Sequence, residues 1–168
     1  MKRSVPKDIA VFGMLASIMF ASKKLMEGLP NIHLIGVFII ALTVVYRKRA
    51  LYPIYIYILL DGIFLGFNPA WIPYLYIWAL LWGAVMLLPQ NLPNRAAPLI
   101  YGVLCGLHGI LFGVLYAPAQ ALLFGLDFRG MLVWIASGFT FDCIHGAGNL
   151  ILGTVLTVPL IRVMKKFG

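Results

Sequence analysis

An acid, an imidazole and a carboxamide lie close together in the otherwise apolar stretch FTFDCIHGAGN, residues 139–149. Asp142, His145 and Asn149 follow the spacing i, i+3 and i+7, so on a helix they share one face. In a membrane such groups are costly and usually face a partner or a water-filled cavity. The spacing therefore indicates either a ligand pocket or a polar contact between helices, in which His and Asn hydrogen-bond to a neighbouring helix.

Two more polar residues, Asp61 and His108, are embedded in other apolar stretches. They are interpreted either as a second wall of the same cavity or as structural hydrogen-bonding groups, with Asp61 paired to a histidine or a tyrosine. Histidines and carboxylates can also bind zinc, but their spacing matches no zinc motif, and we predict no metal site. The chain has no phosphate-binding loop and no dinucleotide-binding glycine pattern, so we predict no cofactor.

Four large aromatic residues form a stripe at helical spacing: Trp71, Tyr74, Trp78 and Trp82. Such a face either packs against neighbouring helices or offers rings that stack on a planar heterocycle and attract a cation. Trp71 and Tyr74 come at the outer end of the expected helix. We therefore predict that these two contribute to the site.

The composition indicates whether the chain is surrounded by water or by lipid. Hydrophobic residues make up 62% of the 168 residues and charged residues only 11%, with a mean hydropathy of +0.98. A soluble domain carries about 25% charged residues. The sequence therefore predicts an integral membrane protein, and Cys105 and Cys143, both within apolar runs, are not expected to form a disulfide.

Proline, glycine and charged residues divide the chain into six candidate membrane spans, each expected to be helical. Residues 130–165 are too long for one straight span, so we expect a break near Gly138, with residues 130–137 at the membrane interface. The prediction is an all-α bundle of six transmembrane helices in a single domain, residues 1–168. The spans are residues 9–22, 33–46, 51–67, 71–88, 98–117 and 139–164.

The basic residues predict the orientation of this bundle. With the N-terminus inside, ten lie at inner ends and three at outer ends, which accounts for all thirteen and obeys the positive-inside rule. Both termini are therefore expected in the cytoplasm, and the net charge of +8 reflects topology and not affinity for nucleic acid. The inner residues are Lys2, Arg3, Lys7, Arg47, Lys48, Arg49, Arg95, Arg162, Lys165 and Lys166, and the outer ones are Lys23, Lys24 and Arg129.

Small residues recur on two of the expected helices. Gly102, Gly106, Gly109 and Gly113 lie on one face of the fifth span, which favours close packing against another helix. In the first span, the same kind of spacing relates Gly13, Ser17 and Ala21. That ridge is interpreted either as an internal packing face or as an external docking face.

The ridge GMLASIMFA and the C-terminal stretch FDCIHGAGNLILGTVLTVPLIRVMKK resemble the substrate-binding S component of energy-coupling factor (ECF) transporters. The resemblance implies a bacterial plasma-membrane subunit that binds a vitamin-like nutrient in an outward-facing pocket. It implies docking, through counterparts of an A-x-x-x-A motif at Gly13, Ser17 and Ala21, onto a transmembrane T component with two cytoplasmic ATPases. The chain itself would then be no enzyme, since its partners hydrolyse ATP.

The resemblance also extends the predicted site to the loop MEGLPNIH, residues 26–33, because the family's pocket uses this loop. In thiamine-binding members a histidine and an asparagine contribute, and their counterparts here are His108, His145 and Asn149. The expected ligand is a small planar heterocycle, neutral or cationic, with thiamine or a pyrimidine favoured. The predicted substrate-binding residues are Glu27, His33, Asp61, Trp71, Tyr74, His108, Asp142, His145 and Asn149.

Two other functions remain open from the sequence. Asp142, His145 and His108 could serve acid–base or metal chemistry in a membrane-embedded enzyme. Alternatively, the chain could be a scaffold subunit that binds no small molecule. Purification separates the three: a binder retains a ligand, an enzyme turns over a substrate, and a scaffold only captures partners.

Overall fold

The computed structural model describes residues 5–167, and all regular secondary structure within this range is helical. This confirms the predicted all-α class. The first four expected spans each coincide with one helix to within a few residues, whereas the fifth is divided between two helices and the sixth lies within a helix that begins 11 residues earlier. The elements are α1 (Val5–Leu25), α2 (Ile35–Tyr46), the 3-10 helix η1 (Arg47–Ala50), α3 (Leu51–Leu65), α4 (Tyr74–Met86), α5 (Ala97–Ile110), α6 (Phe112–Phe124) and α7 (Phe128–Phe167).

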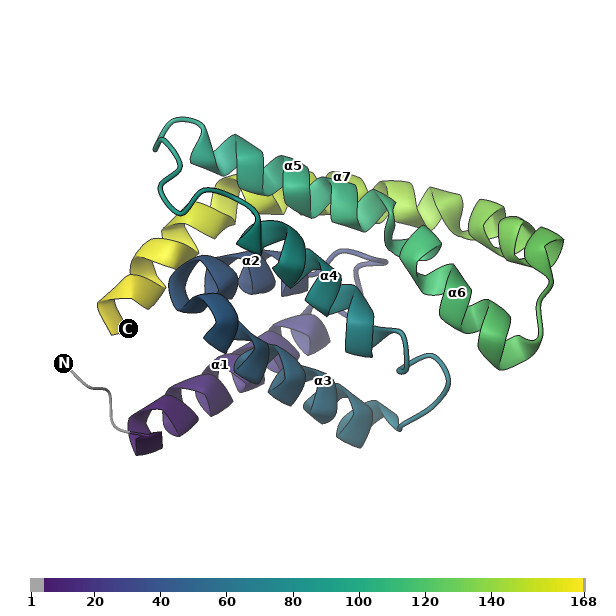
Figure 1. Ribbon diagram of the computed structural model, residues 1–168, viewed down its shortest axis with the longest axis horizontal. Coiled ribbons are helices and arrows are strands. Elements are labelled where there is room, and N and C mark those ends of the chain that lie inside the picture. Colours follow the sequence, from purple (N-terminus) through teal and green to yellow (C-terminus); the bar gives the residue numbers. More distant parts are fainter. Residues whose placement is uncertain (1–4, 168) are drawn as a thin grey trace.

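The short helix α2 lies at the centre of the fold (Figure 1). It has 12 residues, nearly all apolar, and most are buried, as expected for a helix that is hydrophobic on every side. It packs against α7 on one side and α4 on another, while α1 pairs with α3 and α5 pairs with α7. The core therefore forms around α2, and the longer helices surround it.

The predicted break near Gly138 is wrong. The helix α7 has 40 residues in all and passes through Gly138 without interruption. A glycine inside a helix costs only about 1 kcal/mol relative to alanine. The first turns of α7 also gain a partner in α6, where Tyr116 stacks on Trp134 with ring centroids 5.6 Å apart. The interruption instead falls at Leu111, which divides the predicted fifth span into α5 and α6.

Glycines allow α5 to lie directly against α7, which confirms the close packing predicted for this face. A Cβ atom placed on Gly109 would lie 2.9 Å from the backbone N and Cα of Gly146. On Gly106 it would lie 3.0 Å from Leu150 Cβ. Backbone atoms therefore form much of this contact, as in other small-residue helix pairs within membranes.

Two segments are long and apolar enough to cross a membrane by length and composition. They are Ala97–Phe124, which consists of α5 and α6 together, and Phe128–Lys166, which lies within α7. Large apolar side chains are exposed along them, including Leu122 at 87% and Phe128 at 72%. Extended apolar surfaces of this kind are uncommon on soluble monomers. These features indicate association with a membrane.

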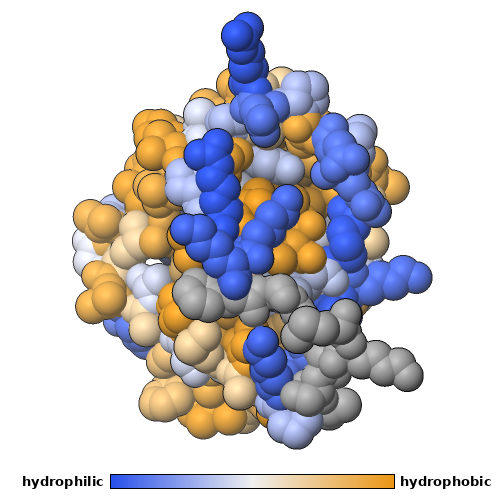
Figure 2. Space-filling model, turned by 90° about the vertical axis from the view of Figure 1, so that its left-hand side faces the viewer, coloured by the Kyte–Doolittle hydropathy of each residue, from blue (hydrophilic) through white to orange (hydrophobic). Residues whose placement is uncertain are grey.

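The first described residues of α1 and the last of α7 lie at the same end of the molecule, together with η1 and the α4–α5 connection (Figure 1). Figure 2 views this end and shows long hydrophilic side chains gathered on it. Lys2 and Arg3, which the charge count placed here, lie outside the described residues. We call this the basic end. The α1–α2 loop lies away from it, near the middle of the long axis, and the far end of the molecule holds the connection between α6 and α7 (Figure 1).

Candidate ligand-binding site

A cavity of about 190 Å³ lies where α1 ends and the α1–α2 loop crosses the bundle. Six parts of the chain contribute to its wall: α1, this loop, α3, α4, α6 and α7. Residues far apart in the sequence therefore meet at one place. The lining residues are Lys23, Lys24, Met26, Glu27, Leu29, Asn31, Ile32, His33, Tyr57, Tyr74, Trp78, Phe112 and His145.

Rings form one continuous part of this wall. The imidazoles of His33 and His145 have centroids 4.8 Å apart, and His145 lies 5.0 Å from the ring of Phe112. Phe112 in turn lies 5.7 Å from Trp78, which is 6.0 Å from His33 and so closes the circuit. These separations are those of interacting aromatic pairs. A flat ligand would meet ring surfaces from four side chains.

Four of the lining side chains carry a buried polar atom with no hydrogen-bond partner among the described residues. These atoms are Nδ1 of His33, the hydroxyl of Tyr57, Nε1 of Trp78 and Nε2 of His145. Folded proteins pair the large majority of such atoms, and each unpaired one costs about 1–3 kcal/mol. Four around one cavity indicate a site whose hydrogen bonds are completed by something other than this chain.

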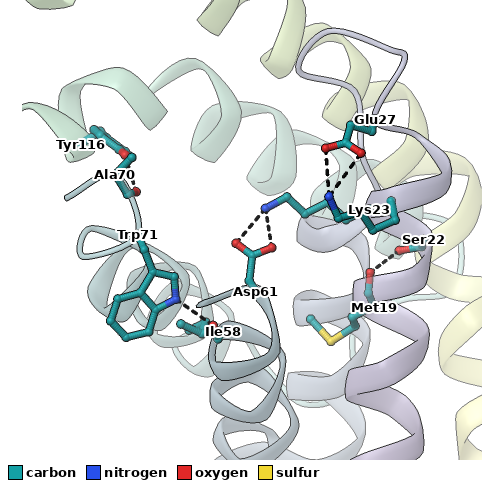
Figure 3. Close-up of polar contacts among 10 residues, drawn as sticks. Met19, Ser22, Lys23, Glu27, Ile58, Asp61, Ala70, Trp71 and Tyr116 are labelled. Carbon is teal, nitrogen blue, oxygen red and sulfur yellow. Dashed lines mark hydrogen bonds and ion pairs between the residues drawn. The ribbon is translucent and has the colours of Figure 1, made fainter. Parts of the chain in front are cut away.

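The charged groups near the cavity are paired with one another (Figure 3). Lys23 Nζ lies 2.8 Å and 3.0 Å from the two carboxylate oxygens of Asp61, which is only 2% exposed. The same ammonium lies 5.1 Å from the centroid of the Tyr74 ring. At the mouth, Lys24 Nζ lies 3.0 Å from the carboxylate of Glu27. The sequence had suggested a histidine or tyrosine partner for Asp61, and the structure pairs it with a lysine.

His33, in the α1–α2 loop, is held in its neutral form. Burial, together with the smaller effect of the nearby positive charge of Lys23, lowers its pKa from 6.5 to about 4. A neutral imidazole has one nitrogen that donates a hydrogen bond and one that accepts. At neutral pH the unpaired Nδ1 can therefore take either role.

Asp142, from the polar face of α7, does not line the cavity. Its Oδ1 accepts a hydrogen bond from the backbone N–H of Gly113 at 3.2 Å. Gly113 is in the first turn of α6, where backbone N–H groups lack helical partners and negative charge is favoured. A Cβ on Gly113 would lie 2.1 Å from Oδ2, so a larger residue here would require the Asp142 carboxylate to move. Asp142 thus fixes the junction between α5 and α6.

The structure brings together four of the nine predicted site residues: Glu27, His33, Tyr74 and His145 line the cavity. Asp61 and His108 lie behind the wall. His108 places its ring 5.5 Å from Trp78 and its Nε2 3.2 Å from the carbonyl oxygen of Ile77. Asp142, Trp71 and Asn149 are also outside the lining.

Trp71 and Asn149 have different surroundings. Trp71 donates a hydrogen bond from Nε1 to the carbonyl oxygen of Ile58 at 2.8 Å (Figure 3). Its ring also packs against Phe67. Asn149 is 1% exposed, and neither atom of its amide has a hydrogen-bond partner among the described residues. Trp71 is thus a structural contact, whereas Asn149 remains an unsatisfied polar group deeper in α7.

Sequence reasoning did not place Lys23, Tyr57, Trp78 or Phe112 in the site. Trp78 is on the predicted aromatic stripe, but the sequence predicts only the two outer residues of that stripe, Trp71 and Tyr74, as site residues. Lys23 had a usable signal, because a lysine at the end of the first helix is a natural partner for an acid embedded in a neighbouring span. Tyr57 and Phe112 had none, since aromatic residues are frequent throughout the chain.

The residues predicted to dock a partner lie toward the surface of α1. Ser17 and Ala21 are exposed, and a Cβ on Gly13 would meet no atom within 4 Å. The ridge is therefore accessible, and it is not used for packing within the described chain.

Within residues 5–167, no group of three or more His, Cys, Asp or Glu side chains is arranged to hold a metal ion.

Comparison of the whole chain with protein-family models, with curated proteins and with solved structures gives no match.

Proposed function

We propose that this chain is the substrate-binding subunit of an ECF-type importer for a small heterocyclic micronutrient. It crosses the bacterial plasma membrane six times, with both termini and the basic end in the cytoplasm. The cavity opens on the outer side. ATP hydrolysis takes place in two cytoplasmic ATPases, which reach this chain through a transmembrane T component.

The observation that carries the proposal is the ring-lined cavity with four unpaired buried polar atoms, beside the α1–α2 loop and away from the basic end (Figure 1). Ligand pockets combine mostly apolar walls with a few convergent polar groups in this way. A membrane scaffold has no need for such a site. The paired state of the nearby carboxylates, Asp61 with Lys23 and Glu27 with Lys24, favours binding over acid–base catalysis.

Two further features support the topology and the docking. The basic residues gather at the end of the molecule that holds the described ends of α1 and α7 (Figure 2), as the positive-inside rule requires of a cytoplasmic face. The ridge Gly13, Ser17 and Ala21 leaves room for another helix to approach α1 closely.

Ligand binding is tested on the full chain purified in detergent. Small molecules extracted from it are identified by mass spectrometry, and the apparent melting temperature is recorded with candidate micronutrients. A ligand at 100 times its Kd adds about 2.7 kcal/mol to the stability of the folded state. Turnover of an added substrate would instead indicate an enzyme, and neither retention nor stabilisation would indicate a scaffold.

His145→Ala is expected to weaken binding of the retained ligand at least about tenfold, which corresponds to about 1.4 kcal/mol. The change removes an imidazole from the cavity wall and the unpaired Nε2 with it. Affinity is measured by isothermal titration calorimetry. Cys143→Ala, on an exposed position of the same helix, is the matched control. Equal affinities for the two variants would assign His145 a purely structural role.

Ala21→Trp is expected to abolish copurification with the T component and ATPases while leaving ligand affinity within about twofold. A bulky ring on the exposed ridge of α1 would prevent close helix approach without touching the cavity. Leu122→Trp, on exposed α6, serves as a control for added bulk. Retention of the complex by Ala21→Trp would show that docking uses another face.

A further inference from the structure

We propose that the cavity selects an uncharged ligand built on a single heteroaromatic ring, with a hydrogen-bonding edge that both donates and accepts. This inference rests on the proposed binding function and narrows it, because the sequence allowed cationic and two-ring ligands such as thiamine. Three features of the site support it: the pairing of its charges, its volume and the chemistry of its unpaired atoms.

The charges exclude ions of either sign. The two lysines at the cavity are matched by two carboxylates, Lys23 by Asp61 and Lys24 by Glu27, so the local sum is zero. An anion would have to displace the buried carboxylate of Asp61 from Lys23. A cation would seek the face of Tyr74, but Lys23 Nζ already lies 5.1 Å from that ring's centroid. An uncharged ring disturbs neither pair.

The volume limits the ligand to one ring. Pockets for drug-sized ligands measure roughly 300–1,000 Å³, whereas this cavity measures about 190 Å³. A pyridine or pyrimidine with a short substituent is of this size. The wall of Phe112, Trp78 and two imidazoles offers ring faces for such a molecule.

The unpaired atoms define the edge of the ligand. Trp78 Nε1 can only donate a hydrogen bond, so the ligand needs an acceptor. The hydroxyl of Tyr57 and the free nitrogens of His33 and His145 can each donate or accept. Because the His33 and His145 rings are 4.8 Å apart, one group that donates and accepts side by side could engage both. Carboxamides, lactams and aminopyrimidines carry such an edge.

The ligand class is tested by calorimetry on the purified full chain with two series of probes. The first keeps one ring and varies charge: nicotinamide, the nicotinate anion and the ring-methylated nicotinamide cation. The second compares the uncharged hydroxymethylpyrimidine half of thiamine with thiamine itself. We expect at least one uncharged probe to bind, at least tenfold more tightly than its charged or two-ring counterparts.

A charged or two-ring probe that binds tightest would overturn the ligand class and leave the transport function standing. If no probe binds, the charge and ring count of the molecule extracted from the purified chain decide the matter directly. Failure of every probe together with absence of any extracted molecule would overturn both the ligand class and the proposed function.

Tyr57→Phe removes a single oxygen atom from the cavity wall and so tests whether the Tyr57 hydroxyl bonds to the edge of the ligand. The hydroxyl has no partner among the described residues, so its removal should leave the melting temperature of the ligand-free chain unchanged or higher. Affinity for the uncharged ligand should fall about tenfold. Tyr101→Phe, on α5 and outside the cavity lining, should change affinity less than twofold. Equal affinity of Tyr57→Phe and the unaltered chain would remove this hydroxyl from the binding edge.

Discussion

Gly109→Leu is expected to separate α5 from α7 and to prevent the chain from folding into a monodisperse species. Even the Cβ of the new side chain would lie 2.9 Å from the backbone of Gly146, and backbone cannot move aside as a flexible side chain can. Overpacking in well-packed interiors costs about 1–3 kcal/mol, and a leucine adds three more carbons to the clash. Size-exclusion chromatography and tryptophan fluorescence on heating measure the effect.

Gly138→Leu is the matched control, since it places the same side chain on α7 at a position with no atom within 4 Å of the new Cβ. Leucine also has the higher helix propensity, so this variant should be as stable as the unaltered chain or more so. Gly109→Ala should lie between the two. A Gly109→Leu protein with an unchanged melting temperature would show that α5 and α7 are not in backbone contact.

Lys23→Met is expected to destabilise the folded chain by about 3 kcal/mol. It removes the cation from Asp61, whose carboxylate is 2% exposed and would then be a buried charge without its partner. Breaking a buried pair costs about 3–5 kcal/mol, and the lower end applies because the Lys23 side chain is 22% exposed. The measurement is unfolding in increasing denaturant, followed by tryptophan fluorescence.

Two variants check the cause. Lys24→Met removes the neighbouring lysine, whose partner Glu27 is 67% exposed, and should cost no more than about 1 kcal/mol. In Lys23→Met/Asp61→Asn the buried charge is gone as well, so most of the lost stability should return. If the double variant is as unstable as Lys23→Met, the packing of the lysine stem and not its charge stabilises this end of α1.

The class of the fold and the positions of its helices follow from the sequence because local patterns control both. Long apolar runs interrupted by proline, glycine and charge mark the first four helices, and the glycine face of α5 correctly predicts a backbone contact, but the division between α5 and α6 at Leu111 was not predicted. The continuity of α7 through Gly138 was not predictable in this way. The first turns of α7 pack against α6, with Trp134 on Tyr116, and no local pattern encodes the pairing of these two helices.

The candidate site was predictable only in part, for the same reason. Helical periodicity places Asp142, His145 and Asn149 on one face, yet they have three different surroundings: a helix N-terminus, the cavity and the interior. Which neighbour each side chain contacts depends on where the facing helices begin and end along the axis of α7. The partner of Asp61 likewise depends on how far α1 extends, and α1 ends three residues later than predicted, at Leu25.

The unequal lengths of the outer helices have a consequence for the surrounding lipid. At ~1.5 Å per residue, the 15 residues of α3 reach about 22 Å, whereas the 40 of α7 reach about 60 Å. A hydrocarbon layer is ~30 Å thick and adapts to mismatch by thinning, thickening or helix tilt. In the proposed six-span topology, lipid beside α3 would therefore have to thin, and α7 would have to lean well away from the membrane normal. This lopsided bilayer deformation would give the molecule a preferred direction of inclination.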